Sequence, residues 1–153
     1  MTLYQHIHHA ILEHQELLTL PLATSNNDVY MAIRQVMRDN PDIFWFSHIW
    51  NYSEESRVLR LHYTIKKERC KEAKRQIEDV ILNEFRILDV QRLTQEEQVM
   101  YVYKSLALYC NYNIYSAFNQ TIYSVFVYRN SVCTGYAKAT QYLFKLLGIE
   151  SQL

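Results

Sequence analysis

Glycine and proline are nearly absent from this chain of 153 residues, which has two of each. Flexible linkers and disordered tracts are rich in such residues, and 49% of the chain is hydrophobic, so the sequence predicts a globular protein. Its length suits one domain with a substantial core, or two small subdomains. No apolar run reaches the roughly 20 residues that a membrane-spanning helix needs.

Cysteine is also scarce, and Cys70, Cys110 and Cys133 form no CxxC motif. An odd number of cysteines argues against a disulfide framework and favours a reducing compartment. The N-terminus lacks the basic and apolar regions of a secretory signal. No histidine stands near the cysteines at the spacing of metal ligands. We therefore expect no metal, no cofactor and a cytoplasmic location.

Net charge is absent as well, because sixteen basic residues balance sixteen acidic ones. The composition gives no electrostatic reason to expect nucleic acid or an anionic membrane as a partner. Four histidines cluster near the N-terminus, but only His6 and His9 stand on one helical face. A solvated face explains this cluster better than a metal site does.

The first ninety residues have the pattern of a small α+β subdomain. Apolar residues at helical spacing predict helices over residues 3–14, 28–39 and 66–86. Alternating or continuous apolar runs predict strands over residues 17–22, 43–46 and 58–65, with a polar turn at 51–56. Cys70 falls on the apolar stripe of the third helix, where it is expected to be structural.

A second region begins near residue 94. Thr94 and Glu97 have the spacing of a capping box, which predicts the start of a helix. That helix carries Val99, Tyr103, Leu106 and Cys110 on one face. The run 121–128 is ambiguous, because its composition favours a strand, whereas a family resemblance carried by the following segment implies a short helix, which we expect.

Both glycines lie in the last part of the chain, which predicts a helix with Cys133 in its first turn. Asn130 or Ser131 is the expected N-cap, and Gly148 suits a left-handed C-terminal turn. Gly135 inside the helix costs about 1 kcal/mol relative to alanine, and a close neighbouring backbone would explain it. The expected apolar stripe consists of Val132, Tyr136, Ala139, Leu143, Leu146 and Leu147.

The position of Cys133 allows two interpretations. A thiol beside the unpaired N–H groups at a helix start is shifted towards thiolate, the nucleophilic form. Alternatively, Cys133 is a small hydrophobic core residue, as most cysteines outside disulfides are. Spacing alone slightly favours the second interpretation.

The residues themselves favour the first. The run Val132-Cys133-x-Gly135-Tyr136-Ala137, continued by Ala139, Leu143 and Leu147-Gly148-Ile149-Glu150, closely resembles the nucleophile helix of bacterial transglutaminase-like proteins. Upstream, Asp39–Phe46 is similar to the start of the N-terminal region in many of these proteins. The resemblance implies a papain-like core with a Cys-His-Asp triad, in which Cys133 is the nucleophile. Family members are transglutaminases, peptidases, amidases or peptide deglycosylases, and some are inactive.

The resemblance also has departures. In the family the catalytic His and Asp follow the cysteine, whereas here all histidines precede it: His6, His8, His9, His14, His48 and His62. Thr134 stands where animal-type transglutaminases have Trp, which argues against protein cross-linking in particular.

Together these features predict an α+β fold, with an N-terminal α+β subdomain over 1–90 and the helical first half of a transglutaminase-like core over 94–153. The expected function is thiol acyl transfer, or hydrolysis of protein or peptide amides, through Cys133. Without a His and an Asp after Cys133, the isolated chain is expected to be inactive. The alternative is a non-catalytic interaction or scaffolding module, which would self-associate or bind a partner through its incomplete core.

Overall fold

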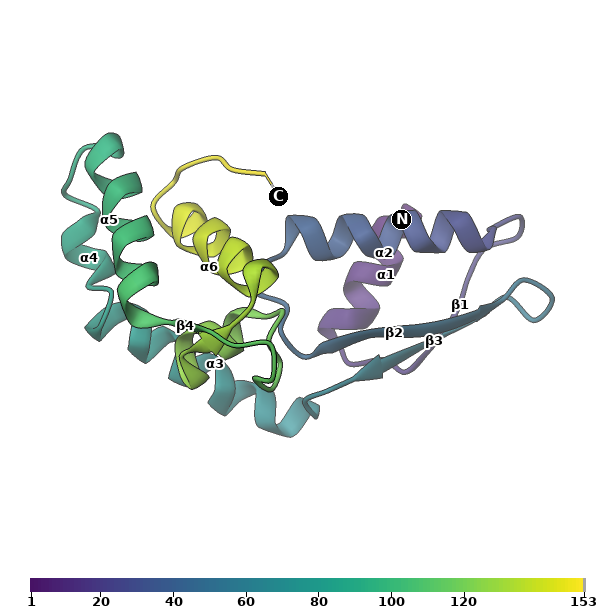
Figure 1. Cartoon of the computed structure of the whole chain (residues 1–153). Helices are drawn as coiled ribbons and strands as arrows, with labels where there is room; N and C mark the ends of the chain where they lie inside the picture. Colours follow the sequence, from purple (N-terminus) through teal and green to yellow (C-terminus); the bar gives the residue numbers. More distant parts are fainter. Residues whose placement is uncertain (153) are drawn as a thin grey trace. The chain divides into compact units, whose positions relative to one another are not determined.

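The computed structural model describes residues 1–152 and combines helices with short strands (Figure 1), which confirms the α+β class. The chain divides into two compact units, Met1–Cys70 and the residues from Lys71 onward. The boundary predicted near residue 90 lies inside the second unit.

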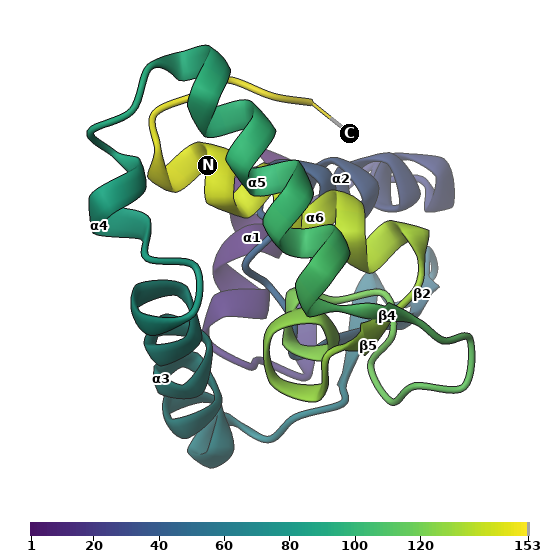
Figure 2. The same ribbon diagram turned by 60° about the vertical axis from the view of Figure 1, so that its left-hand side comes forward.

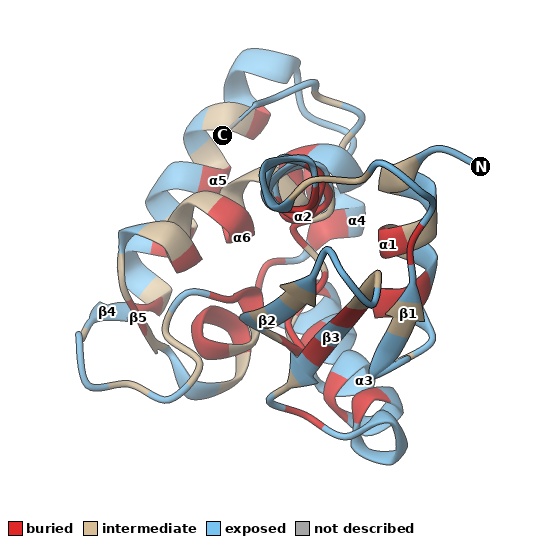
Figure 3. Cartoon of the chain, turned by 90° about the vertical axis from the view of Figure 1, so that its right-hand side faces the viewer, coloured by how far each residue is buried: buried red, intermediate tan, exposed pale blue. Residues whose placement is uncertain are grey.

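The first unit contains a three-stranded antiparallel sheet in the order β1-β3-β2, with β1 (Leu17–Thr19), β2 (Phe46–Ser53) and β3 (Val58–Tyr63). Two helices, α1 (Leu3–Leu12) and α2 (Asn26–Asp39), pack together on one face of this sheet (Figure 1). The core side of β3 carries Leu59 and Leu61, both buried, whereas most of the edge strand β2 is half-buried or exposed (Figure 3). The alternation of apolar and polar residues on β3 follows from this arrangement.

The predicted strand at 43–46 is wrong, because β2 begins only at Phe46 and continues through the expected turn to Ser53. Ile43, Phe44 and Trp45 are buried without joining the sheet, and the Trp45 indole N–H donates to the carbonyl of Ile11 at 2.9 Å. Their apolar character thus reflects side-chain packing rather than strand pairing. The polar residues at 51–53 pair with β3 on the solvated edge of the sheet.

The second unit is mainly helical. Helix α3 (Lys67–Asn83) crosses the boundary between the units, and α4 (Ile87–Val90), α5 (Gln95–Tyr109) and α6 (Cys133–Leu146) follow. Between α5 and α6 lie β4 (Asn111–Tyr112), the π-helical turn η1 (Ser124–Tyr128) and β5 (Asn130–Ser131). Helices α5 and α6 run side by side, and β4 pairs with β5 in parallel just before α6 begins (Figure 2). The ambiguous run 121–128 is therefore helical rather than a strand.

Helix α5 starts as the sequence predicts, since the Thr94 hydroxyl accepts from the Glu97 N–H and the Glu97 carboxylate accepts from the Thr94 N–H. Its predicted inner face is partly wrong, because Tyr103 is 54% exposed. The buried positions include Gln98, whose side-chain amide donates to the carbonyl of Val90 at 3.2 Å. A satisfied amide can replace an apolar residue on a buried face.

Candidate functional site

Cys133 is the first residue of α6 and is exposed, whereas Cys70 and Cys110 are buried. The predicted N-cap is wrong, because the capping position is held by Val132, which offers no side-chain hydrogen bond. The Ser131 hydroxyl is engaged elsewhere, because it donates to the carbonyl of Asn119 at 2.7 Å and accepts from the hydroxyl of Ser124 at 2.7 Å. The side-chain N–H₂ of Asn130 donates to the carbonyl of Tyr128 at 2.8 Å.

The missing cap leaves backbone donors beside the thiol. Within residues 1–152, the N–H groups of Cys133 and Thr134 make no hydrogen bond, and the first N–H of α6 with a partner in the preceding turn is that of Tyr136, which donates to the carbonyl of Val132 at 3.1 Å. Unpaired N–H groups at a helix start carry a partial positive charge that favours anions nearby. An exposed thiolate at Cys133, or an oxyanion formed next to it, would lie close enough to be stabilised by these N–H groups.

The segment that leads into α6 is tightly anchored. The N–H groups of Asn111 and Asn113 donate to the carbonyls of Arg129 and Ser131 at 2.9 and 2.8 Å, which holds β4 against β5. Ser124 is fully buried in η1, and its hydroxyl lies 2.7 Å from that of Ser131. These bonds fix the backbone immediately before Cys133.

Gly135 is required at its position by a close approach. A Cβ atom there would lie 1.9 Å from the hydroxyl of Ser131 and 2.9 Å from the carbonyl oxygen of Asn119. The predicted close neighbour is thus confirmed, and it consists of one side chain and one backbone group. The Ser131 hydroxyl, which is hydrogen-bonded to Asn119, fills the space where a side chain at residue 135 would lie. The contact between Ser131 and Gly135 therefore determines where α6 starts.

The opposite end of α6 has the predicted glycine turn. Gly148 has φ of 73°, in the left-handed region. Its N–H donates to the carbonyl of Lys145 at 3.2 Å, and the N–H of Ile149 donates to that of Phe144 at 2.8 Å. This pair of bonds closes the helix as a Schellman motif.

Lys138 is a buried residue that sequence reasoning missed. It is 5% exposed on α6, and burial lowers the pKa of its ammonium to about 8. No carboxylate forms an ion pair with it in the described part of the chain. Lys138 is the one charged residue between Arg129 and Lys145. A lysine isolated among uncharged residues is the sequence feature that could have predicted its burial. Leu146, in contrast, was expected inside and is 40% exposed.

The first unit brings together a second cysteine and a histidine. The Cys70 sulfur lies 3.3 Å from Nε2 of His14, which also lies 3.2 Å from the carbonyl oxygen of Ile65. Cys70 is buried, as its stripe predicts, but its imidazole neighbour was not expected. The two residues are far apart in the sequence, so no local spacing could have linked them.

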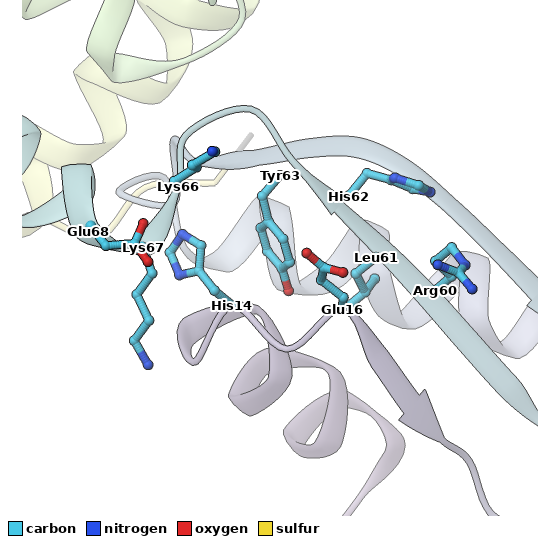
Figure 4. A pocket seen from close by; sticks show the side chains of 9 residues that line it. All are labelled: His14, Glu16, Arg60, Leu61, His62, Tyr63, Lys66, Lys67 and Glu68. Atoms are coloured by element: carbon cyan, nitrogen blue, oxygen red, sulfur yellow. The ribbon is translucent and has the colours of Figure 1, made fainter.

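Beside this pair lies a hollow of about 640 Å³ (Figure 4). His14 and Tyr63 form its centre, with Glu16 near Tyr63 and Lys67 on the other side of His14. Nowhere in residues 1–152 do three or more His, Cys, Asp or Glu side chains gather as metal ligands would. None of the helices in that range combines the length and apolar character that crossing a bilayer demands.

No protein-family model matches the chain, and no curated protein sequence is significantly similar to it. The resemblance to transglutaminase-like proteins therefore remains a prediction, which rests on the residues around Cys133.

Proposed function

We propose that Cys133 is the nucleophile of a transglutaminase-like thiol site, which acts in acyl transfer or in hydrolysis of protein or peptide amides. The observation that carries this proposal is the exposed thiol at the first residue of an uncapped fourteen-residue helix. An exposed cysteine is accessible to a substrate, and a helix start favours its thiolate form.

The chemistry follows from that arrangement. The thiolate of Cys133 attacks the carbonyl carbon of an amide, and the carbonyl oxygen gains negative charge. The N–H groups of Cys133 and Thr134 are available to stabilise such an oxyanion. Loss of the amine leaves a thioester on Cys133, which water or an acceptor amine then resolves.

The site needs a base that its own unit does not contain. All six histidines lie between His6 and His62, so none belongs to residues 71–152. Without a base, the thiol cannot pass its proton to the departing amine, and triads lose orders of magnitude in rate when one member is removed. We therefore expect this chain alone to turn over no amide.

An activated ester tests the nucleophile without the base, because p-nitrophenolate leaves without needing a proton. The folded chain is mixed with p-nitrophenyl acetate, and the acylated peptides are identified by mass spectrometry over time. Cys133 should be acylated at least about tenfold faster than Cys70 or Cys110. A Cys133→Ser variant provides the matched control, in which the fast acylation should disappear.

Equal acylation of all three cysteines would contradict the proposal and favour the alternative, a non-catalytic interaction or scaffolding module. An amide substrate offered in parallel gives a second outcome. Amide turnover that Cys133→Ser abolishes would show that the chain supplies its own base, against our expectation of an incomplete site.

A further inference from the structure

The tertiary structure places a thiol and an imidazole within hydrogen-bonding distance in the first unit. Cys70 lies in the first turn of α3, and His14 lies just after the end of α1. The distance from Sγ to Nε2 is 3.3 Å, and the same nitrogen is 3.2 Å from the carbonyl oxygen of Ile65. The proposed function of Cys133 does not involve this pair.

The Cys70 sulfur and Nε2 of His14 share one acceptor, the carbonyl of Ile65, which lies 4.0 Å from the sulfur and 3.2 Å from Nε2. A neutral pair fits these contacts when the ring N–H and the thiol both donate to that carbonyl, or when Nε2 accepts the thiol hydrogen. Transfer of that hydrogen from the sulfur to Nε2, 3.3 Å away, gives a thiolate and an imidazolium whose Nε2–H points to the sulfur and the carbonyl. The geometry therefore allows a thiolate–imidazolium pair at Cys70 and His14.

The imidazole is held in place from both sides. Its ring lies 5.7 Å from that of Trp45 at an angle of 17°, and 4.8 Å from that of Tyr63. Tyr63 is itself fixed, because its hydroxyl donates to the carbonyl of Gln15 at 2.8 Å. The backbone of His14 is left-handed, with φ of 55°. An imidazole restrained in this way keeps its orientation towards the sulfur.

The hollow borders the pair on the His14 side, because its lining includes His14 but not Cys70. His14 forms part of its wall together with Arg60, Lys66 and Lys67, while Glu16 and Glu68 provide the acidic groups (Figure 4). Lys67 is paired with Glu13 at 3.0 Å. Because Cys70 is 5% exposed, a molecule little larger than water is the reagent that suits this pair.

We propose that Cys70 and His14 form a thiolate–imidazolium pair that small hydroperoxides oxidise. The thiolate sulfur attacks one oxygen of the O–O bond, a sulfur–oxygen bond forms, and the O–O bond breaks. The departing oxygen takes the proton from Nε2 of His14 and leaves as water or an alcohol. Cys70 becomes a sulfenic acid and loses two electrons, the hydroperoxide gains them, and His14 becomes neutral. A thiol reductant reverses a sulfenic acid.

Cys110 provides a matched control within the same chain. It is 4% exposed, close to the 5% of Cys70, and its sulfur lies 3.7 Å from the carbonyl of Asn111 instead of an imidazole. Burial raises the pKa of the Cys110 thiol. A difference in oxidation between these two cysteines therefore reports on the imidazole rather than on burial.

The test treats the folded full chain with hydrogen peroxide, quenches it with catalase at set times, and unfolds it in dimedone to trap sulfenic acids. Peptide mapping should show Cys70 oxidised at least about tenfold faster than Cys110. The bulkier cumene hydroperoxide should reduce this preference, because access to Cys70 is narrow. Equal rates at Cys70 and Cys110 with hydrogen peroxide would overturn the proposal.

A His14→Asn variant separates the pair from simple accessibility. Asparagine tolerates the left-handed backbone at this position but provides no imidazole. If the pair drives the reaction, oxidation of Cys70 should slow to the rate of Cys110. If Cys70 merely reacts during local opening, a loosened variant should oxidise it as fast or faster, and that result would overturn the proposal. The rate of maleimide labelling at Cys70 measures any loosening directly.

Discussion

Cys133 and Cys70 both lie in the first turn of a helix, but their surroundings differ. Cys133 is exposed and has unpaired backbone N–H groups beside it, with no histidine in its own unit. Cys70 is buried and lies 3.3 Å from an imidazole. Cys133 thus has access and backbone donors but no imidazole, whereas Cys70 has a neighbouring imidazole but little access. The size of a reagent should decide which of them reacts.

The two sites also differ in the contacts that hold them, which are local in the sequence for Cys133 and between distant segments for Cys70. The start of α6 depends on local contacts, in which Ser131, Asn119 and Gly135 fit together within a short stretch of chain. The Cys70 site depends on a contact between distant segments, which the aromatic rings of Trp45 and Tyr63 stabilise. Substitutions should therefore damage one site without damaging the other.

The largest effect is expected for Gly135→Val. Its Cβ would lie 1.9 Å from the Ser131 hydroxyl and 2.9 Å from a backbone carbonyl, so the start of α6 must shift. We expect a loss of about 3 kcal/mol in the free energy of unfolding, at the upper end of overpacking effects. Urea denaturation measures this loss, and fast acylation at Cys133 should disappear with it.

Gly148→Ala is the matched control for Gly135→Val. Nothing lies near its missing Cβ, but its φ of 73° disfavours other residues, so the cost should be about 1 kcal/mol. Peroxide oxidation of Cys70 in the first unit should be unchanged in both variants. If Gly135→Val costs no more than Gly148→Ala, the close approach does not determine the start of α6.

A smaller effect of opposite sign is expected for Lys138→Met. Burial lowers the pKa of Lys138 to about 8 in the folded chain, well below its usual 10.5. Below pH 8 the folded chain bears the full penalty of burying an ammonium. Between pH 8 and 10.5 the folded chain has lost the proton that the unfolded chain retains, so stability rises with pH in that window.

Methionine removes the charge and keeps a flexible apolar side chain. Lys138→Met should therefore stabilise the chain at pH 7, by at most about 3 kcal/mol, and the gain should shrink as the pH approaches 10.5. Urea midpoints of both chains at pH 7 and pH 10 check this. A loss of stability at both values would mean that the ammonium makes a favourable interaction that outweighs its burial.

Features that depend on neighbours in the sequence were predictable. The capping box of Thr94 and Glu97 and the glycine turn at Gly148 both follow from a few adjacent residues. The crowding over Gly135 was predictable in kind, because a glycine inside a helix usually has a packing reason. Its partners were not, since Asn119 reaches the helix through a loop.

Features that depend on tertiary contacts were not predictable. Ser131 is a good N-cap by type, but its hydroxyl bonds to the carbonyl of Asn119 and to the hydroxyl of Ser124, and Val132 occupies the cap. Strand β2 begins at Phe46 because of its pairing with β3, although the apolar run starts earlier. The contact between Cys70 and His14 exists only after the first unit folds. In each case a distant group determines the role of a residue whose local preference differs.

The smallest effect, expected for Val132→Thr, tests the unpaired N–H groups at Cys133. Threonine has the shape of valine and adds one hydroxyl at the N-cap, where the backbone is already extended, with φ of −115° and ψ of 177°. Its oxygen can accept from the N–H of Thr134 or Gly135, which should stabilise α6 by about 0.5–1 kcal/mol. The same bond satisfies a donor that otherwise favours the thiolate, so acylation of Cys133 should slow by about two- to fivefold. Val132→Ala, which cannot cap, separates this effect from the loss of a side chain. If Val132→Thr stabilises the chain while Cys133 reacts as fast as before, the unpaired donors contribute nothing to its reactivity, and exposure alone distinguishes Cys133 from Cys70.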